Sequence, residues 1–332
     1  MDYPLVSIVT PSYNQAQFIE ETLLSVKGQD YPNLEHIVID GGSTDGTVDI
    51  LRRYEDEYNL RWVSEPDEGQ SDAINKGFRM AKGEIIGWVN SDDTYMPGAV
   101  SAAVNHLRQN PTLGWLYGDV YWIDEDSYVL REAKGEPFDL KKLICKEFHP
   151  IQPTAFFRHQ TLKSIGYLDT SLHFVMDTDL FIRLGVEYQA GYIPQVLATR
   201  RLHAQAKSVG LITDFAPEVT LILDKLFSND DLPEDIASAR DLSYRIARKY
   251  AYMYAGIAYL DSRRMKQARG NLWQALQINF KLFNKQSAYL ALLLMQAALD
   301  VKWFCPREFL KRRSETEFRR RHREEVVDWF YQ

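Results

Sequence analysis

The chain reads Ile85-Ile86-Gly87-Trp88-Val89-Asn90-Ser91-Asp92-Asp93 at the point that decides its fold. The apolar run is typical of a strand that is buried on both faces of a parallel sheet. It ends abruptly in polar and acidic side chains, and carboxylates in such a position can hold a divalent cation together with diphosphate oxygens and water. Adjacent aspartates after a strand can also form a plain turn, but the apolar approach favours a functional site.

Strand and helix patterns alternate on both sides of this stretch. Apolar and β-branched runs predict strands at residues 5–10, 34–40, 60–64, 84–89, 114–122 and 154–157. Apolar residues at helical spacing predict helices at residues 18–26, 47–58, 71–81 and 177–184. Because this alternation forms βαβ units with right-handed crossovers, we expect an α/β domain over residues 1–213 with a mostly parallel, Rossmann-like sheet flanked by helices.

Helical periodicity with few strand signals predicts an all-α C-terminal appendage over residues 214–332. About residues 249–282 resemble one tetratricopeptide-like hairpin, through the spacing of Gly256, Tyr259, Ala268, Leu272 and Ala275, although Arg263 stands where a glycine is usual. Such repeats normally need several stacked copies, so an incidental helical hairpin is the alternative.

The end of the chain alternates basic residues with glutamate over residues 307–325. A solvated helix face is one interpretation, and a docking surface for anionic membrane lipid is the other. The most apolar segment, residues 288–304, is interrupted by Gln296, Asp300 and Lys302, so we expect it to be too short and too polar to span a membrane.

The composition excludes some classes of protein. Hydrophobic residues make up 45% and charged residues 26% of the 332-residue chain, as in ordinary globular proteins. The net charge of -7 argues against a nucleic-acid-coating protein, which needs a broad basic surface. Cys145 and Cys305 match no metal spacing, and no secretory signal is evident, so we expect a cytoplasmic protein, with peripheral attachment to the inner face of the membrane as the alternative.

Polar loops follow the first two predicted strands. After the first, Pro11, Tyr13 and Asn14 can place an aromatic ring beside a nucleotide base, although these residues are also common in turns. After the second, Asp40 can accept hydrogen bonds from a base or ribose, and Gly42 permits close approach of the backbone to a ligand. Capping of the next helix and a calcium loop are the alternatives, but the closing glutamate of an EF-hand is missing.

A third loop leads into the predicted helix at residues 71–81. Gly69 and the first backbone N–H groups of this helix can hold a diphosphate, with Lys76 adding positive charge. A plain helix cap and a surface lysine form the alternative. The acids of these loops and Asp92 all follow strand ends, so we expect them to converge on one edge of the sheet, where ligands of such folds bind.

The order and combination of these motifs resemble an inverting family 2 glycosyltransferase with the GT-A fold, over about residues 5–210. The resemblance implies nucleoside contacts from Pro11, Tyr13, Asn14, Asp40 and Gly42. It also implies that Asn90-Ser91-Asp92 occupies the D-x-D motif, with Asp92 as the metal carboxylate. Asn90 departs from the commoner aspartate but can hydrogen-bond to ribose, whereas the role of Asp93 as ligand or turn residue stays open.

The same resemblance assigns further positions. Ile74 stands where many members carry an arginine in the Ala-x-Asn segment that ends at Asn75, so Lys76 or Gln70 is expected to compensate. His203 lies in the region where members place a histidine on the metal or diphosphate, and imidazole is a competent ligand. The segment from His149 to Gln152 is similar to an acceptor-side segment.

Asp177 matches the catalytic base of the family. An inverting transfer needs a carboxylate that takes the proton of the attacking acceptor hydroxyl. The alternative for Asp177 is a helix cap, whereas Asp179 suits a cap or a pairing with Arg183 at helical spacing.

The expected function is therefore transfer of a sugar, with inversion, from a nucleoside diphosphate sugar to a glycan or lipid-linked acceptor. Family analogy implies a UDP-linked donor. The expected cofactor is Mn²⁺ or Mg²⁺. A sugar nucleotidyltransferase and a non-catalytic nucleotide-sugar-binding module that recruits partners are the rival hypotheses. The nucleotidyltransferase would want a Gly-rich basic loop after the first strand, and residues 12–18 lack one.

Overall fold

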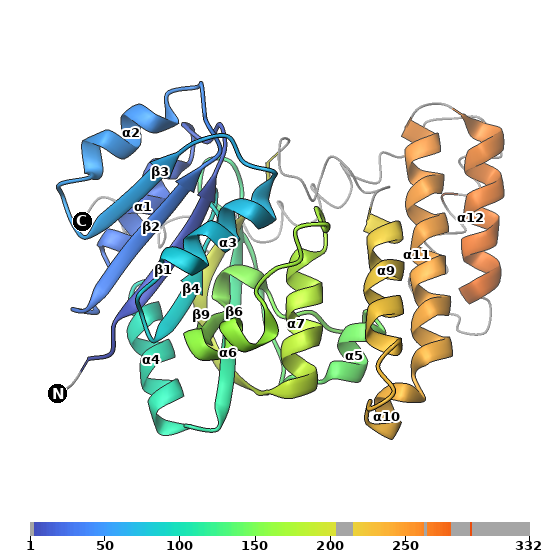
Figure 1. Ribbon diagram of the computed structural model, residues 1–332. Helices are drawn as coiled ribbons and strands as arrows, with labels where there is room; N and C mark the ends of the chain where they lie inside the picture. The colour runs from blue at the N-terminus through green and yellow to red at the C-terminus, as the bar shows by residue number, and fades with distance from the viewer. Residues whose placement is uncertain (1–2, 204–214, 262–263, 280–292, 294–332) are drawn as a thin grey trace. The chain divides into compact units, whose positions relative to one another are not determined.

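The computed structural model describes residues 3–203, 215–261, 264–279 and Leu293 (Figure 1). These residues form two compact units. The first contains residues 3–139 and 149–203, and the second contains the remaining described residues. Residues 140–148 thus belong with the second unit, a detail that the predicted boundary at residue 213 did not include.

The first unit is built on one large curled sheet. Its strands are β1 (Val6–Ser12), β2 (Leu34–Asp40), β3 (Leu60–Ser64), β4 (Ile85–Trp88), β5 (Thr94–Tyr95), β6 (Leu113–Ile123), β7 (Val129–Ala133), β8 (Phe156–Arg158) and β9 (Gln189–Arg201). They lie in the order β3-β2-β1-β4-β8-β6-β9-β5, and β7 pairs with β6 outside this path. The mostly parallel sheet that the sequence predicts is therefore present.

Strand directions decide where a ligand can bind. β1, β2, β3 and β4 are parallel, and β8 runs antiparallel to both β4 and β6. Because β9 is parallel to β6, the strands β1, β2, β4, β6 and β9 all point the same way. Their carboxyl ends consequently share one edge, which is the ligand-binding edge of open α/β sheets.

Helices flank this sheet (Figure 1). They are α1 (Ile19–Lys27), α2 (Thr47–Tyr54), α3 (Gln70–Met80), α4 (Ala99–Gln109), α6 (His159–Ile165) and α7 (Met176–Glu187). The helix α3 approaches β1 closely, since a Cβ on Gly77 would lie 2.3 Å from Cγ1 of Val9. A larger residue at position 77 would push α3, and the loop that precedes it, away from the sheet.

The second unit is helical in its described residues. It contains α5 (Leu140–Ile144), α9 (Phe215–Phe227), α10 (Glu234–Ala237), α11 (Arg240–Asp261) and α12 (Met265–Asn279). α11 and α12 share a core cluster that includes Ile257, Leu260, Ala268, Leu272 and Ala275. Gly256 allows this packing, because a Cβ there would lie 2.6 Å from Cγ of Leu272.

Some expectations for the C-terminal part fall elsewhere. Arg263 and the charged segment at residues 307–325 lie outside the described residues. Within the described part of the chain, no helix is both long and apolar enough to cross a membrane.

His36 is a buried titratable group in the middle of β2. Its Nε2 lies 2.9 Å from Oγ1 of Thr10, and its Nδ1 lies 2.8 Å from the hydroxyl of Tyr58. The ring is fully inaccessible to solvent, and this burial lowers the pKa of His36 to about 3. The imidazole is therefore neutral in the folded protein, with one nitrogen donating and the other accepting.

Substitution of His36 is expected to reduce the loss of folding stability that occurs as the pH falls. The unfolded chain binds a proton at His36 below a pKa of about 6.5, whereas the folded chain does not until about pH 3, so stability is lost as the pH falls through that window. Between pH 7 and pH 5 the wild type should lose about 2 kcal/mol more than His36→Gln, as measured by urea unfolding. His106→Gln, at a half-buried position, is the control, and equal losses in all three proteins would contradict the assignment.

Candidate active site

The loops at the carboxyl edge of the sheet bring Asp92 and His203 together. Asp92 follows β4 and His203 follows β9, and Oδ2 of Asp92 lies 2.9 Å from Nε2 of His203. The His203 ring also packs against Phe18, with ring centres 4.8 Å apart. The carboxylate suits Mn²⁺ or Mg²⁺, and the imidazole is a common ligand of transition metals, so the pair can form a partial ligand set. Among the described residues no group of three or more acids, histidines or cysteines forms a complete metal site, so a cation would need further ligands from phosphate and water.

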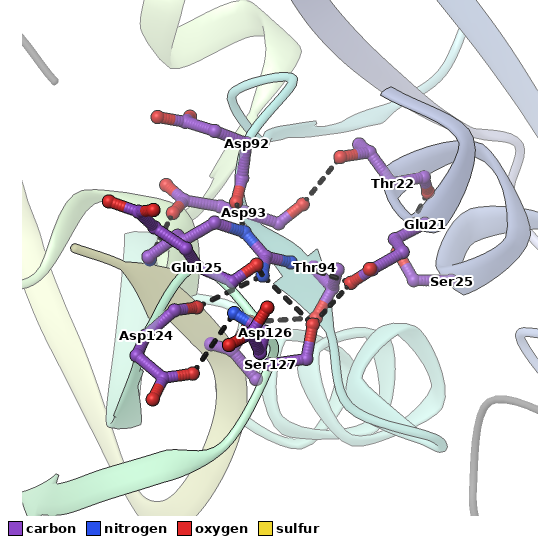
Figure 2. Close-up of polar contacts among 12 residues, drawn as sticks. Glu21, Thr22, Ser25, Asp92, Asp93, Thr94, Asp124, Glu125, Asp126 and Ser127 are labelled. Atoms are coloured by element: carbon purple, nitrogen blue, oxygen red, sulfur yellow. Dashed lines mark hydrogen bonds and ion pairs between the residues drawn. The ribbon is translucent and has the colours of Figure 1, made fainter. Parts of the chain in front are cut away.

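The guanidinium of Arg201 organises the loops around this pair. It is completely buried and lies over the ring of Phe18, 4.8 Å from its centre. Its Nη2 donates to Glu21 of α1 at 2.6 Å, and its Nε donates to the backbone carbonyl of Asp92 at 2.9 Å. Its Nη1 donates to Ser127 Oγ at 2.8 Å. Figure 2 shows these acids and hydroxyls gathered around one point.

Further contacts extend from Arg201 into the β6–β7 loop. Nη1 also lies 3.1 Å and 3.2 Å from the carbonyl oxygens of Asp124 and Glu125. The loop is closed by Asp124 Oδ1, which accepts the backbone N–H groups of Asp126 and Tyr128. One side chain thus connects α1, the turn after β4 and the β6–β7 loop.

Asp93 is part of this framework. Its side chain is buried, and Oδ1 accepts the backbone N–H of Arg201 at 2.9 Å. Thr22 Oγ1 donates to the Asp93 carbonyl oxygen at 2.7 Å. Burial and the nearby charge of Asp92 raise the pKa of Asp93 to about 8. Asp93 Oδ1 thus contributes to the turn by binding the backbone of β9, and whether Asp93 also binds a metal stays open.

Asn90 lies in a network of side-chain amides. Its Oδ1 accepts Nε1 of Trp88 and Nε2 of Gln70, both at 3.0 Å. Its Nδ2 donates to Oε1 of Gln152 at 3.0 Å, and Gln152 Nε2 in turn donates to the backbone carbonyl of Trp88 at 2.6 Å.

The ends of this network fix its polarity. The indole N–H of Trp88 can only donate, and the carbonyl of Trp88 can only accept. The first forces Oδ1 of Asn90 toward Trp88, and the second forces Oε1 of Gln152 toward Asn90. Only an amide at position 90 can both accept and donate in this arrangement. The departure from the commoner aspartate therefore has a local physical reason.

The predicted nucleoside residues lie in two loops that are tied to each other. The backbone N–H of Asn14, a residue with φ of +52°, donates to Ser43 Oγ at 2.7 Å, and Thr44 N–H donates to Asn14 Oδ1 at 2.9 Å. Tyr13 is 62% exposed and free to stack on a ring. Pro11 lies within the buried strand β1, opposite Ile39.

The carboxylate of Asp40 accepts hydrogen bonds mainly from its own loop. The side chain is fully buried, and Oδ2 accepts the backbone N–H groups of Gly42 and Ser43 and the hydroxyl of Ser64. Ser43 Oγ donates to the other oxygen, Oδ1. Gly42 has φ of +82°, a value that few other residues adopt. Asp40 thus shapes the loop, and its contact with a nucleoside stays a prediction.

The helix α3 is anchored through Asn75. Asn75 is buried, and its amide exchanges hydrogen bonds of 2.9 Å and 3.0 Å with the carbonyl and N–H of Leu168. These two bonds give Asn75 a structural role, and its contact with the donor stays a prediction. Lys76 Nζ lies 3.0 Å from Glu65 and 3.3 Å from Asp72, so its charge is already balanced.

The start of α3 remains open as a phosphate site. Gly69 precedes the helix with φ of +114°, and its N–H donates to Asp67 Oδ1 at 2.9 Å. Gln70 is half-buried and reaches Asn90, so it connects this helix to the end of β4. Ser91 in the turn is buried.

Asp177 lies in the first turn of α7. The N-cap position of this helix is Val175, and Asp177 Oδ1 accepts the backbone N–H of Thr178 at 2.7 Å. Among the described residues no group donates to its other oxygen, Oδ2. The predicted pairing of Asp179 with Arg183 is confirmed, with Nη2 at 2.7 Å from Oδ2.

The segment before α7 is anchored next to Gly69. Ser71 Oγ donates to the carbonyl of Leu172 at 2.9 Å, and a Cβ on Gly69 would lie 3.8 Å from Nδ1 of His173. At the other side of the first turn, Nε2 of His149 lies 2.9 Å from Thr178 Oγ1. Asp177 is thus placed by contacts with the start of α3 and with the segment that precedes β8.

Sequence reasoning missed the parts played by Gln152, Glu21 and Phe18. Gln152 was noticed only within an acceptor-side segment, and no local pattern predicts that its amide reaches Trp88. Glu21 reads as an ordinary acid in the first turn of a helix. Its partner Arg201 is 180 residues away, which no spacing rule detects.

Comparisons with known proteins give a consistent result. The model of a family described as Glycosyl transferase family 2 matches residues 7–166. Uncharacterized glycosyltransferases of Mycobacterium tuberculosis are 33% identical over 183 residues, which is 54% of this chain and 68% of theirs. The chondroitin synthase of Escherichia coli is 27% identical over 212 residues, or 62% of this chain and 30% of that protein.

Solved structures are similar in fold. A mannosyltransferase from Pyrobaculum calidifontis in complex with GDP-Man and Mn²⁺ superposes with a TM-score of 0.61 at 22% identity, covering 95% of this chain and 85% of that chain. Residues 1–349 of S. aureus TarS in complex with UDP-GlcNAc give a TM-score of 0.61 at 19% identity, covering 89% and 88%.

The amide network makes a prediction about Asn90→Asp. The substitution replaces a donor with an acceptor that faces Gln152 Oε1, and rotation of Gln152 would turn its amide away from the Trp88 carbonyl. The free energy of unfolding should fall by about 1–3 kcal/mol in urea titrations without metal. Asn59→Asp is the matched control, because the amide of Asn59 also donates one hydrogen bond but at an exposed site. A loss at position 90 no larger than at position 59 would refute the fixed polarity.

Proposed function

Because the chain belongs to glycosyl transferase family 2, we propose that it transfers a sugar with inversion from a UDP-linked donor to the hydroxyl of a glycan or lipid-linked acceptor, with the help of Mn²⁺ or Mg²⁺. Its family and its GT-A-type α/β fold, both expected from the sequence, are confirmed. The observation that carries the proposal is the meeting of Asp92 and His203 at the carboxyl edge of the sheet.

The donor side of the proposal is supported by the surrounding loops. The exposed ring of Tyr13 and the cross-tied loops of Asn14 and Ser43 offer a surface for the nucleoside. Among the described residues, the backbone N–H groups of Gln70 and Ser71 at the start of α3 have no hydrogen-bond acceptor, and they can bind a diphosphate. Two solved structures of this fold hold nucleoside diphosphate sugars, UDP-GlcNAc in one and GDP-Man in the other, and both support a donor of this class. UDP is proposed by analogy with the first.

Asp92 and His203 would hold the cation. A divalent ion bound there supplies positive charge that stabilises the departing nucleoside diphosphate. The fit of the residues rests on their chemistry, because a carboxylate oxygen and an imidazole nitrogen point at each other from two loops that Arg201 holds in place. The hydrogen bond between them orients both side chains in the absence of the ion.

Asp177 is the proposed base. Its Oδ1 is held by the N–H of Thr178, which fixes the carboxylate, while Oδ2 has no partner in the described part of the chain. A fixed carboxylate with one free oxygen can accept the proton of an acceptor hydroxyl as that hydroxyl attacks the anomeric carbon. The anchoring of the preceding segment to Ser71 supports placement beside the donor.

The rival functions explain fewer of these features. A sugar nucleotidyltransferase would need a basic, glycine-rich loop after β1, and residues 12–18 contain neither Gly nor Lys nor Arg. A non-catalytic binding module gives no reason for a carboxylate oxygen of Asp177 that has no partner among the described residues.

Asp177→Asn should abolish transfer while leaving donor binding intact. The amide keeps the size of the side chain but cannot take a proton, so kcat should fall about a thousandfold or more and the Kd of UDP should change by less than about threefold. Glu187→Gln, at the exposed end of the same helix, is the control and should retain full activity. Undiminished turnover in Asp177→Asn would remove it as the base.

Asp92→Asn should weaken the metal site specifically. The concentration of Mn²⁺ that gives half-maximal activity should rise about tenfold or more, and calorimetry should show the same loss for Mn²⁺ binding in the presence of UDP. Asp126→Asn, an exposed acid of the nearby β6–β7 loop, is the matched control. Equal Mn²⁺ dependence of the two variants would contradict the assignment of Asp92.

A further inference from the structure

Trp122 lies between two arginines on neighbouring strands. In the sheet it pairs with Arg131 of β7 on one side and with Arg200 of β9 on the other. Cross-strand partners share one face of a sheet, so the three side chains form a row. The guanidinium carbons of Arg131 and Arg200 lie 4.7 Å and 4.8 Å from the centre of the Trp122 ring. We call these three residues the arginine row.

Among the described residues, no carboxylate neutralises either guanidinium of the arginine row. In the described part of the chain, no carboxylate lies within ion-pair distance of Arg131 or Arg200, and neither side chain makes a hydrogen bond. Partial burial and the charge of Arg200 both lower the pKa of Arg131. Two like charges that share one aromatic ring repel each other, and this repulsion would be relieved by an anion.

Arg201, the next residue of β9, differs from Arg200 in that its guanidinium is fully paired. Arg201 is fully buried and donates to Glu21, to Ser127 and to backbone carbonyls. Adjacent residues of a strand point to opposite faces, so Arg200 projects away from the side on which Arg201 and Phe18 meet. The charge of Arg200 is felt by buried Asp93, but Asp93 is occupied by the backbone N–H of Arg201.

The arginine row lies at the limit of the apolar core. The preceding residues on the same face, Val120 of β6 and Ala198 of β9, belong to the buried cluster, and Trp122 packs against its border. Arg131 is exposed and Arg200 is half-buried, so a solute can reach both side chains from the solvent. A polar solute would therefore meet two donor forks backed by a rigid aromatic ring.

We propose that the arginine row binds an oxyanion, a phosphate or a carboxylate, that the acceptor carries. The assignment to the acceptor rests on the proposed sugar transfer, whereas the anion site itself does not. Arg200 lies three residues before His203, so their Cα atoms are at most about 11 Å apart. This separation is short enough for an acceptor to place its anionic group at the arginine row while its hydroxyl lies beside the donor.

Calorimetry on the full, metal-free chain tests the site with inorganic phosphate and glucuronate as separate probes. The wild type should bind at least one probe at the arginine row, and Arg131→Gln/Arg200→Gln should weaken that binding about tenfold or more. The tighter probe tells whether the natural group is a phosphate or a carboxylate. Arg52→Gln/Arg53→Gln is the control, because it removes the same charge from exposed positions of α2.

Several results would overturn the proposal. These are equal weakening in both double variants, unchanged binding in Arg131→Gln/Arg200→Gln, or no binding of either probe up to tens of millimolar. A parallel titration with UDP and Mn²⁺ should give the same Kd for wild type and variant, and a weaker Kd would assign the arginines to the donor instead.

Two further controls keep the result interpretable. Thermal unfolding checks that the double variant is folded, and the single variant Arg131→Gln, on an exposed strand position, replaces it if it is not. Because no measurement needs turnover, loss of activity in Asp177→Asn and loss of anion binding can be told apart.

Discussion

The buried guanidinium of Arg201 is the constraint on which the geometry of the candidate site depends. A cation taken fully out of water costs several kcal/mol unless every donor is met, and Arg201 meets this requirement with Glu21, Ser127 and carbonyl oxygens from two loops. Arg201 is therefore fully paired only when the helix α1, the turn after β4 and the β6–β7 loop all occupy their positions in the folded protein. The backbone carbonyl of Asp92 is one of these acceptors. Its hydrogen bond to Arg201 holds the turn that orients the Asp92 side chain toward His203.

The remaining loops are held by side chains that bind backbone groups rather than one another. Asp40 gathers the N–H groups of its own loop, and Asn75 clasps both polar groups of Leu168. Such contacts fix a loop without a regular element beneath it. These contacts hold Asp40 and Asn75 within the fold, whereas Tyr13 is exposed and Asp177 Oδ2 has no partner among the described residues.

The sequence predicts the first four strands and their edge well, because β1, β2 and β3 are each followed by their own helix and β4 is an apolar run that ends in a polar motif. It does not predict β9, whose buried positions are broken by Pro194 and by register shifts, nor the short strands β5 and β7. The proximity of Asp92 and His203 agrees with the expectation from motif and family position, and their binding of a metal stays a proposal. The structural roles of Asn75 and Gln152 were not predictable, because a polar residue that faces a ligand and one that satisfies a distant backbone group look alike in a sequence.

The fixed polarity of the amide network has a consequence for how this chain can evolve. Positions 90 and 152 are 62 residues apart, yet a carboxylate at one is tolerated only with a new donor at the other. A single step toward the acidic motif common in the family therefore passes through a less stable intermediate, and the order of the two changes matters. Among homologues the two positions should vary as a pair, so that the identity of one residue forecasts the other.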